Sequence, residues 1–229
     1  MENRTCQNCK KEFTIEEDDF GFYAKLNVPP PTFCPTCRMQ RRFMFRNERT
    51  LYKRTCDLCK ESTISIFNPD SPYTVYCNTC WWGDDWECGE YYLDYDPNKN
   101  FFAQMKELQL KAPFMSKIVG TSTLINSEYV NHSGHCKDCY LIYNADKCEN
   151  VYYSSDIVNV RDSSDCMLVG PAELLYNSIG GGGSSNVYFS KNCTKSVNVW
   201  YSKECIGCTN CFGCVNLRKK TYCIYNKSY

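Results

Sequence analysis

The sequence predicts a mixed fold with three successive parts. Four Cys-x-x-Cys pairs in the first 80 residues indicate two zinc-ribbon or treble-clef modules, which we place at 1–85. A helical spacing of apolar residues predicts an amphipathic helix within a short, acidic, Trp- and Tyr-rich linker at 86–120. An apolar or small residue recurs at every sixth position after residue 120, which indicates a Cys-rich parallel β-helix at 121–229.

The cysteine content points to metal binding rather than to disulfides. The chain has 19 cysteines in 229 residues, and its 26 Lys and Arg balance its 26 Asp and Glu. The sequence shows no secretory leader and no apolar run long enough for a bilayer, so we expect a cytoplasmic protein without membrane contact. Thiols stay reduced in the cytoplasm, where paired cysteines more often bind metals.

The segments between the cysteine pairs indicate which pairs share a metal ion. Strand-like runs at 13–15 and 20–26, and again at 62–67 and 73–76, predict a hairpin between the first two pairs and another between the last two. The segment 38–55 looks helical instead. We therefore expect two structural Zn²⁺ ions, each held by four thiolates. The predicted ligands are Cys6, Cys9, Cys34 and Cys37 for site 1, and Cys56, Cys59, Cys77 and Cys80 for site 2.

A cationic segment follows the second cysteine pair and predicts an Arg-rich helix over 38–54. Arginine forks suit phosphate groups, and several of these cations share one helical face, so the segment is a candidate nucleic-acid-binding surface. We favour the other interpretation, in which these cations pair with the acidic segment 84–96. The residues of this surface are Arg38, Arg41, Arg42, Arg46, Arg49, Lys53 and Arg54.

Aromatic and apolar residues in the linker and just before it predict packing roles. Trp81, Trp82 and Trp86 are expected to form the small core on which the two zinc modules pack. Residues 100–112 predict the amphipathic helix, which Pro113 ends.

The hexad pattern predicts the geometry of the β-helix. Three faces of six residues would give a coil of about 18 residues. The repeat shifts by three between Ala172 and Val187, so we expect a loop or an irregular coil around the glycines at 180–183. Cysteines fill many inward positions and are expected to act as small apolar core residues. The thiols expected to stack are Cys148 on Cys166, Cys193 on Cys211, and Cys205 on Cys223.

The two histidines of the chain lie beside two of these cysteines. Imidazole and thiolate together bind zinc, so these residues are a candidate third metal site. We favour a capping or buried role for them. The candidate ligands are His132, His135, Cys136 and Cys139.

Four long motifs resemble those of a family of uncharacterised zinc-binding proteins, with a zinc ribbon and a Cys-rich repeat, common in small-genome bacteria known from metagenomes. They are VPPPTFCPTCRMQRR, FRNERTLYKRTCDLC, MLVGPAELLY and CFGCVNLRKKTYCIYNK. The resemblance spans nearly the whole chain. It implies zinc binding and implies no known activity.

These observations favour a non-enzymatic, zinc-dependent binding or scaffold protein. We expect its β-helix to present a Tyr-rich surface to a protein partner or to a second copy of the chain. One alternative is an RNA- or ribosome-associated protein that binds through the Arg-rich helix. The other is an enzyme like the hexapeptide-repeat acyltransferases, whose catalytic histidine would have to be His132 or His135. We predict no catalytic residue beyond that alternative, because no general base with a partner is recognisable.

Overall fold

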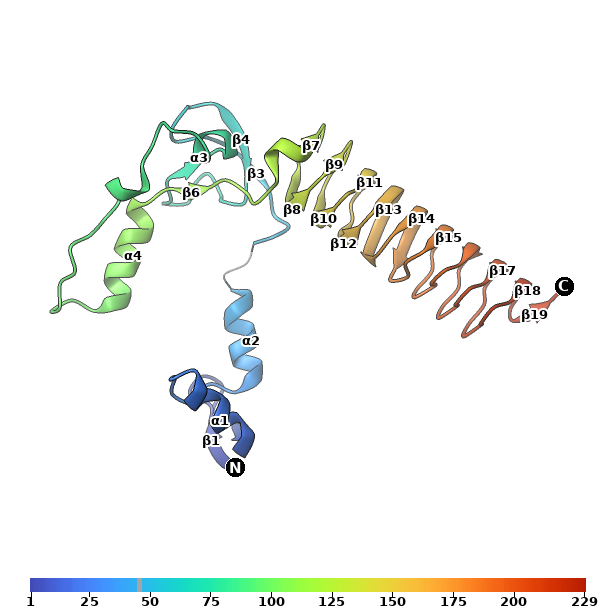
Figure 1. Cartoon of the computed structure of the whole chain (residues 1–229), viewed down its shortest axis with the longest axis horizontal. Coiled ribbons are helices and arrows are strands. Elements are labelled where there is room, and N and C mark those ends of the chain that lie inside the picture. The colour runs from blue at the N-terminus through green and yellow to red at the C-terminus, as the bar shows by residue number, and fades with distance from the viewer. Residues whose placement is uncertain (45–46) are drawn as a thin grey trace. The chain divides into compact units, whose positions relative to one another are not determined.

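A computed structural model describes residues 1–44 and 47–229 (Figure 1). The chain divides into two compact units, Met1–Asn47 and Glu48–Tyr229. The two cysteine-rich modules, which we predicted as one tandem region over 1–85, fall in different units. The second unit carries both the second module and the β-helix. Arg46 of the predicted cationic surface lies outside the described residues.

The first unit is a hairpin followed by two helices. Strands β1 (Glu2–Thr5) and β2 (Glu12–Ile15) pair antiparallel, and helices α1 (Glu17–Lys25) and α2 (Pro35–Phe43) follow. The strand predicted at 20–26 is therefore wrong, because most of it lies in α1. The acidic residues between the two predicted strands start this helix: the Asp19 carboxylate accepts a hydrogen bond from the Glu16 N–H at 3.2 Å, as in a capping box.

The second unit begins with the same hairpin arrangement. Strands β3 (Tyr52–Thr55) and β4 (Ser62–Ser65) pair antiparallel, and β5 (Val75–Tyr76) pairs parallel with β6 (Phe114–Met115). The short helices α3 (Asn78–Trp81) and η1 (Cys88–Glu90) follow β5. The predicted hairpins between cysteine pairs are wrong in both modules, since each hairpin instead spans a Cys-x-x-Cys turn.

One of the two predicted helices is confirmed and the other is wrong. The amphipathic helix expected at 100–112 is α4 (Phe101–Lys111), and its Asn100 side chain caps the N-terminus by accepting from the Ala103 N–H at 3.2 Å. The single Arg-rich helix over 38–54 is wrong. Helix α2 ends at Phe43, and Lys53 and Arg54 belong to strand β3.

The rest of the second unit is a parallel β-solenoid, as predicted. It starts at η2 (Thr121–Thr123), and its strands stack in succession along the axis (Figure 1). The strands are β7 (Leu124–Ile125), β8 (Val130–Gly134), β9 (Cys136–Lys137), β10 (Ile142–Asp146), β11 (Glu149–Tyr152), β12 (Ser155–Val158), β13 (Val160–Val169), β14 (Ala172–Ile179), β15 (Ser184–Tyr188), β16 (Val197–Trp200), β17 (Thr209–Phe212), β18 (Thr221–Ile224) and β19 (Lys227–Ser228). The last of these, β19, turns back antiparallel to β18.

The coil length predicted for this solenoid is wrong. Val199 pairs with Cys211, and Cys211 pairs with Cys223, so each coil takes twelve residues rather than about 18. Every third side chain enters the interior, as for Val130, Ser133 and Cys136. Residues between these inward positions adopt a positive φ, for example His132 at 50°, and turn the chain. Four sides of three residues therefore close each coil.

The glycine segment at 180–183 joins β14 to β15 outside the strands, as expected of a loop, but it keeps the twelve-residue register, so no irregular coil forms there. Ala172 pairs with Ser184 and Leu175 with Val187 across it. Gly181 has a φ of 91°, and a Cβ there would lie 2.2 Å from the Cys193 carbonyl oxygen. Gly180 and Gly181 are glycines because the next coil passes too close for a Cβ at either position.

Buried apolar residues, serines and thiols share the solenoid interior. Cys205, Cys208, Cys211 and Cys214 fill the four successive inward positions of one coil, and all are at most 3% exposed. The predicted stacking of thiols is wrong in register, because Cys223 lies on Cys211 rather than on Cys205. The thiol groups donate to backbone carbonyls, as Cys205 does to Cys214 at 3.5 Å.

Within the described residues, no helix is long and apolar enough to cross a membrane.

Candidate metal centres and binding surface

The first cysteine cluster joins the β1–β2 turn to the start of α2. Cys6 and Cys9 lie in that turn, Cys34 is the N-cap residue of α2, and Cys37 lies in its first turn. The four Sγ atoms all lie within 4.8 Å of one another, and those of Cys9 and Cys34 are 3.8 Å apart. Thiolates about 2.3 Å from a tetrahedral zinc ion lie about 3.8 Å from one another, so this cluster can hold a metal ion.

The second cluster repeats this arrangement. Cys56 and Cys59 lie in the β3–β4 turn, Cys77 caps α3, and Cys80 lies within that helix. Its four Sγ atoms also lie within 4.8 Å of one another, with 3.9 Å between Cys59 and Cys77. The eight predicted ligands are thus brought together in the two predicted groups of four.

Backbone hydrogen bonds to sulfur are shared by both clusters. The Cys34 N–H donates to Cys6 Sγ at 3.2 Å, and the Cys77 N–H donates to Cys56 Sγ at the same distance. The residue after each knuckle, Lys10 or Lys60, takes a positive φ of 62° or 65°. This knuckle, hairpin and helix start correspond to the treble clef that we weighed from the sequence.

These hydrogen bonds lower the pKa of one thiol in each cluster. Burial raises the pKa of Cys6, but the N–H groups of Cys34, Cys9 and Asn8 outweigh it and lower that pKa to about 6. Burial likewise opposes the N–H groups of Cys77, Cys59 and Leu58, which lower the pKa of Cys56 to about 7. Hydrogen bonding to the charged form of a thiol favours that form.

The last thiol of each cluster is held protonated in the absence of a cation. The Asn8 amide lowers the pKa of Cys37, but burial and the thiols of Cys34, Cys9 and Cys6 raise it to about 11. Burial and the thiols of Cys77, Cys59 and Cys56 raise the pKa of Cys80 to about 12. A divalent ion provides the opposing charge that four neighbouring thiolates need.

The candidate third site is not assembled. Cys136 and Cys139 point into the solenoid, at 1% and 2% exposure, whereas His132 and His135 occupy the positive-φ turns. His135 Nδ1 lies 2.9 Å from an Asp146 carboxylate oxygen instead. The two four-cysteine clusters are the metal-binding groups found among the described residues. Every third residue points inward, which places neighbouring His and Cys on opposite sides of the coil wall and gives the two cysteines the buried role that we favoured from the sequence.

The predicted cationic residues do not form one helical face. Arg38, Arg41 and Arg42 lie on α2, and the Arg41 guanidinium lies 4.7 Å from the Phe33 ring centroid. In the second unit, Arg49 contacts Asp156 at 3.6 Å, and Arg54 contacts Asp57 at 3.0 Å. Lys53 pairs through its backbone with Ile64 in the β3–β4 ladder. Neither acidic partner belongs to the segment 84–96 that we had expected.

Two of the three tryptophans at 81–86 pack within the second module. The Trp81 and Trp86 rings lie 4.9 Å apart, and the Trp86 indole N–H donates to the Trp81 carbonyl at 3.1 Å. Trp86 also contacts the ring of Tyr76, next to the second cluster. Trp82 is 72% exposed.

Outward-facing aromatic rings form a strip along one edge of the solenoid. We call this set the aromatic strip: Tyr129, Tyr140, Tyr152, Tyr153, Tyr176, Tyr188, Phe189, Trp200, Tyr201, Phe212 and Tyr225. The twelve-residue register produces it, because Tyr176 pairs with Tyr188 and Tyr188 with Trp200 in successive coils. The sequence indicated a Tyr-rich face, but the assumed coil length hid which rings are neighbours.

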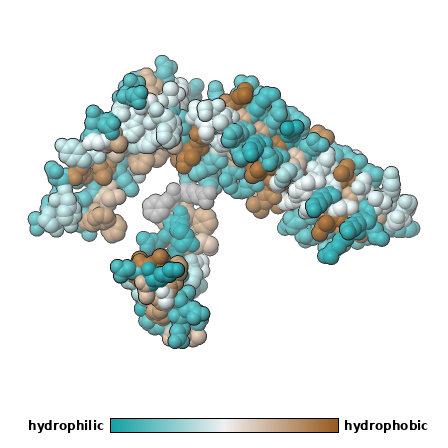
Figure 2. All heavy atoms as spheres, viewed as in Figure 1, coloured by the Kyte–Doolittle hydropathy of each residue, from teal (hydrophilic) through white to brown (hydrophobic). Residues whose placement is uncertain are grey.

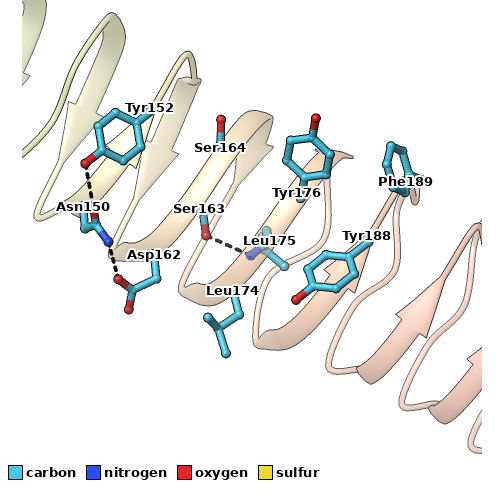
Figure 3. Close-up of a pocket in the computed structure, with 10 residues that line it drawn as sticks. All are labelled: Asn150, Tyr152, Asp162, Ser163, Ser164, Leu174, Leu175, Tyr176, Tyr188 and Phe189. Carbon is cyan, nitrogen blue, oxygen red and sulfur yellow. Dashed lines mark hydrogen bonds between the residues drawn. The ribbon is translucent and has the colours of Figure 1, made fainter.

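A pocket interrupts the aromatic strip where a serine replaces a ring. Ser164 lies between Tyr152 and Tyr176 in the register, two coil steps of about 4.8 Å each. The resulting cavity of about 450 Å³ is bounded by these tyrosines, by Leu174 and by the Asp162 carboxylate (Figure 3). Asp162 accepts a hydrogen bond from Asn150 at 2.6 Å, which fixes the carboxylate at the rim.

No protein-family model and no curated protein matches the chain.

Proposed function

We propose that the chain is a non-enzymatic, zinc-dependent binding or scaffold protein. Each four-cysteine cluster would hold one Zn²⁺ ion as a structural centre. The observation that carries this proposal is the convergence of eight thiols into two groups of four, each with its sulfurs within 4.8 Å. An all-thiolate set fills the four positions of a tetrahedral zinc ion and leaves no position for a substrate, as in structural sites.

The aromatic strip and its pocket support the binding role. The pocket joins three tyrosine rings, those of Tyr152, Tyr176 and Tyr188, to the Asp162 carboxylate. Residues 121–183 around it hold eight Asp and Glu against three Lys and Arg. Tyrosine faces and a carboxylate suit a cationic side chain, so the partner we propose for this site is a protein that presents an exposed Arg or Lys.

Neither the acyltransferase alternative nor the RNA-binding alternative gains support from the fold described above. The likeness to hexapeptide acyltransferases rested on a coil of about 18 residues, and the register has twelve. The Arg-rich helix of the RNA alternative ends at Phe43. The family resemblance remains our proposal for the origin of the chain.

Metal content tests the structural centres. Protein purified without added metal should carry two zinc ions per chain when native and denatured masses are compared. Cys6→Ser and Cys56→Ser should each lose one ion, because they belong to different clusters. A native mass without metal, or loss of both ions in one variant, would contradict two independent zinc centres.

Closing the pocket tests the binding role. A photo-cross-linker at Leu174 should form adducts with a partner protein in cells. Ser164→Tyr, which completes the row of rings and fills the cavity, should abolish those adducts at unchanged metal content. The matched control is Val158→Tyr, which adds a ring at an exposed position half a coil away, on the opposite side. Adducts that persist in Ser164→Tyr would contradict a partner in this pocket.

A further inference from the structure

The charge of the solenoid changes sign along its axis. Residues 121–183 have three Lys and Arg against eight Asp and Glu, a net charge of −5, whereas residues 184–229 have seven against one, a net charge of +6. On the face shown in Figure 2, hydrophilic side chains cover much of these last coils. The cations are Lys191, Lys195, Lys203, Arg218, Lys219, Lys220 and Lys227, and all are exposed.

These cations are available to a ligand. Among the described residues, none of the seven takes part in an ion pair. The single acid of the region, Glu204, accepts a hydrogen bond from the Asn192 amide at 2.8 Å. The positive charge of these coils is therefore not neutralised within the second unit.

Aromatic rings stand next to the cations in a repeated pattern. The sequences Asn186–Lys191 and Asn198–Lys203 both read Asn-Val-aromatic-aromatic-Ser-Lys, and the register places the second directly on the first. Val and Ser point inward, so Asn, both rings and Lys face outward in each coil. The Phe189 and Tyr201 rings stack with centroids 4.9 Å apart, and those of Tyr188 and Trp200 lie 5.7 Å apart.

The asparagines form the other border of this surface. The Asn186 amide donates to Asn198, and the Asn198 amide donates to Asn210 at 2.9 Å. Amide groups held in a row beside outward-facing rings can hydrogen-bond base edges, while lysines on the opposite border meet phosphates. An acidic peptide would use the cations but not the rings, and a duplex conceals its base faces.

We infer that the coils of residues 184–229 bind single-stranded nucleic acid, with bases against the rings of Phe189, Trp200 and Tyr201 and phosphates on Lys191 and Lys203. This site adjoins the pocket at Ser164, which Phe189 also lines, and it does not include the Arg-rich segment 38–54. It extends the proposed scaffold role, because a second kind of ligand would occupy the basic end of the same solenoid.

Fluorescence anisotropy of a labelled 12-nucleotide oligouridylate with the zinc-loaded full chain tests this site. The double variant Lys191→Gln/Lys203→Gln should bind at least tenfold more weakly, and its slope of log affinity against log salt should fall by about 1.4, since each phosphate contact on a single strand contributes about 0.7. Trp200→Leu keeps an apolar side chain and should bind about tenfold more weakly with an unchanged salt slope.

The matched control is Lys137→Gln/Lys147→Gln, which removes two exposed lysines from the acidic half and should leave the affinity unchanged. The inference is overturned if wild-type protein does not bind the oligonucleotide, or if the two double variants behave alike. It is also overturned if a duplex or polyglutamate competes as well as the single strand. Zinc content measured on the same samples separates these failures from a failure of the proposed metal centres.

Discussion

Asn8 distinguishes the first metal centre from the second. Its amide donates to Cys37 Sγ at 3.4 Å, whereas the equivalent knuckle position of the second cluster is Leu58. Groups that hydrogen-bond a metal ligand commonly change metal affinity by about 10- to 100-fold. We expect Asn8→Leu to weaken zinc binding by about tenfold at the first centre, measured by competition with a chromogenic chelator.

The second centre provides the internal control for this variant. Its chelator competition should remain unchanged in Asn8→Leu, because Leu58 already occupies the corresponding position. Equal weakening of both centres would show a general loss of folding rather than the loss of one hydrogen bond.

The buried thiol of Cys166 makes the stability of the solenoid depend on pH. Burial raises the pKa of this thiol to about 11, while an unfolded thiol titrates near about 8.5. Between these values the folded chain holds more protons than the unfolded chain, so the free energy of unfolding falls as pH rises. This one thiol should make the free energy of unfolding about 2 kcal/mol smaller at pH 10 than at pH 7, since one pKa unit corresponds to about 1.4 kcal/mol.

Cys166→Ser isolates that contribution, because serines occupy the same interior column at Ser154 and Ser178. Urea unfolding at pH 7 and pH 10 should show a smaller loss of stability in the variant than in the wild type. An identical loss in both proteins would refute the titration of this thiol.

At the level of elements, the glycine segment 180–183 tests the close approach of two coils. Gly181→Ala should destabilise the solenoid by about 3 kcal/mol, because the new Cβ would meet the Cys193 carbonyl and the backbone would stay at positive φ. Gly182→Ala is the control. Its Cβ would lie 3.5 Å from the nearest atom, Gly170 Cα, so we expect a change below about 1 kcal/mol. Denaturant unfolding followed by circular dichroism measures both; equal effects would contradict the steric argument.

Some of these elements could be predicted from the sequence and others could not. The cysteine pairs predicted both clusters, because a knuckle turn is local and its spacing is constrained by the ion. The six-residue recurrence predicted a solenoid but not its coil length, since a side of three residues divides both twelve and about 18. The aromatic residues at 20–26 predicted a strand. Most of this run instead lies in α1, because Glu16 and Asp19 form the capping box that starts a helix. Pairing of distant cations, such as Arg49 with Asp156, depends on the fold and has no local signal.

At the level of the whole molecule, the two units depend on metal to different degrees. The buried hydrophobic residues of the first unit are Cys6, Ile15, Cys34 and Cys37, and Phe13 and Phe33 pack beside the three thiols. The solenoid has a continuous core from Val130 to Cys223. Small domains with so little apolar core fold only with their metal.

Zinc removal should therefore separate the two parts. After chelation, hydrogen exchange should become fast in β1, β2 and α2 and remain slow in the solenoid strands from β10 to β17. Loss of protection throughout the solenoid would contradict this division, and retained protection in the first unit would show that its fold does not need the ion.

The twelve-residue register also determines how many residues this half of the protein can gain or lose while its coils stay intact. Removing 193–204 would join Asn192 to Cys205 and leave each inward column intact, with the aromatic strip shorter by one coil. Removing six residues would keep inward side chains inward but would move every ring beyond the deletion to the opposite side of the coil. Natural variation in the length of such a chain should therefore proceed by whole coils. Each step would lengthen or shorten the reach of the protein without altering what any one coil can recognise.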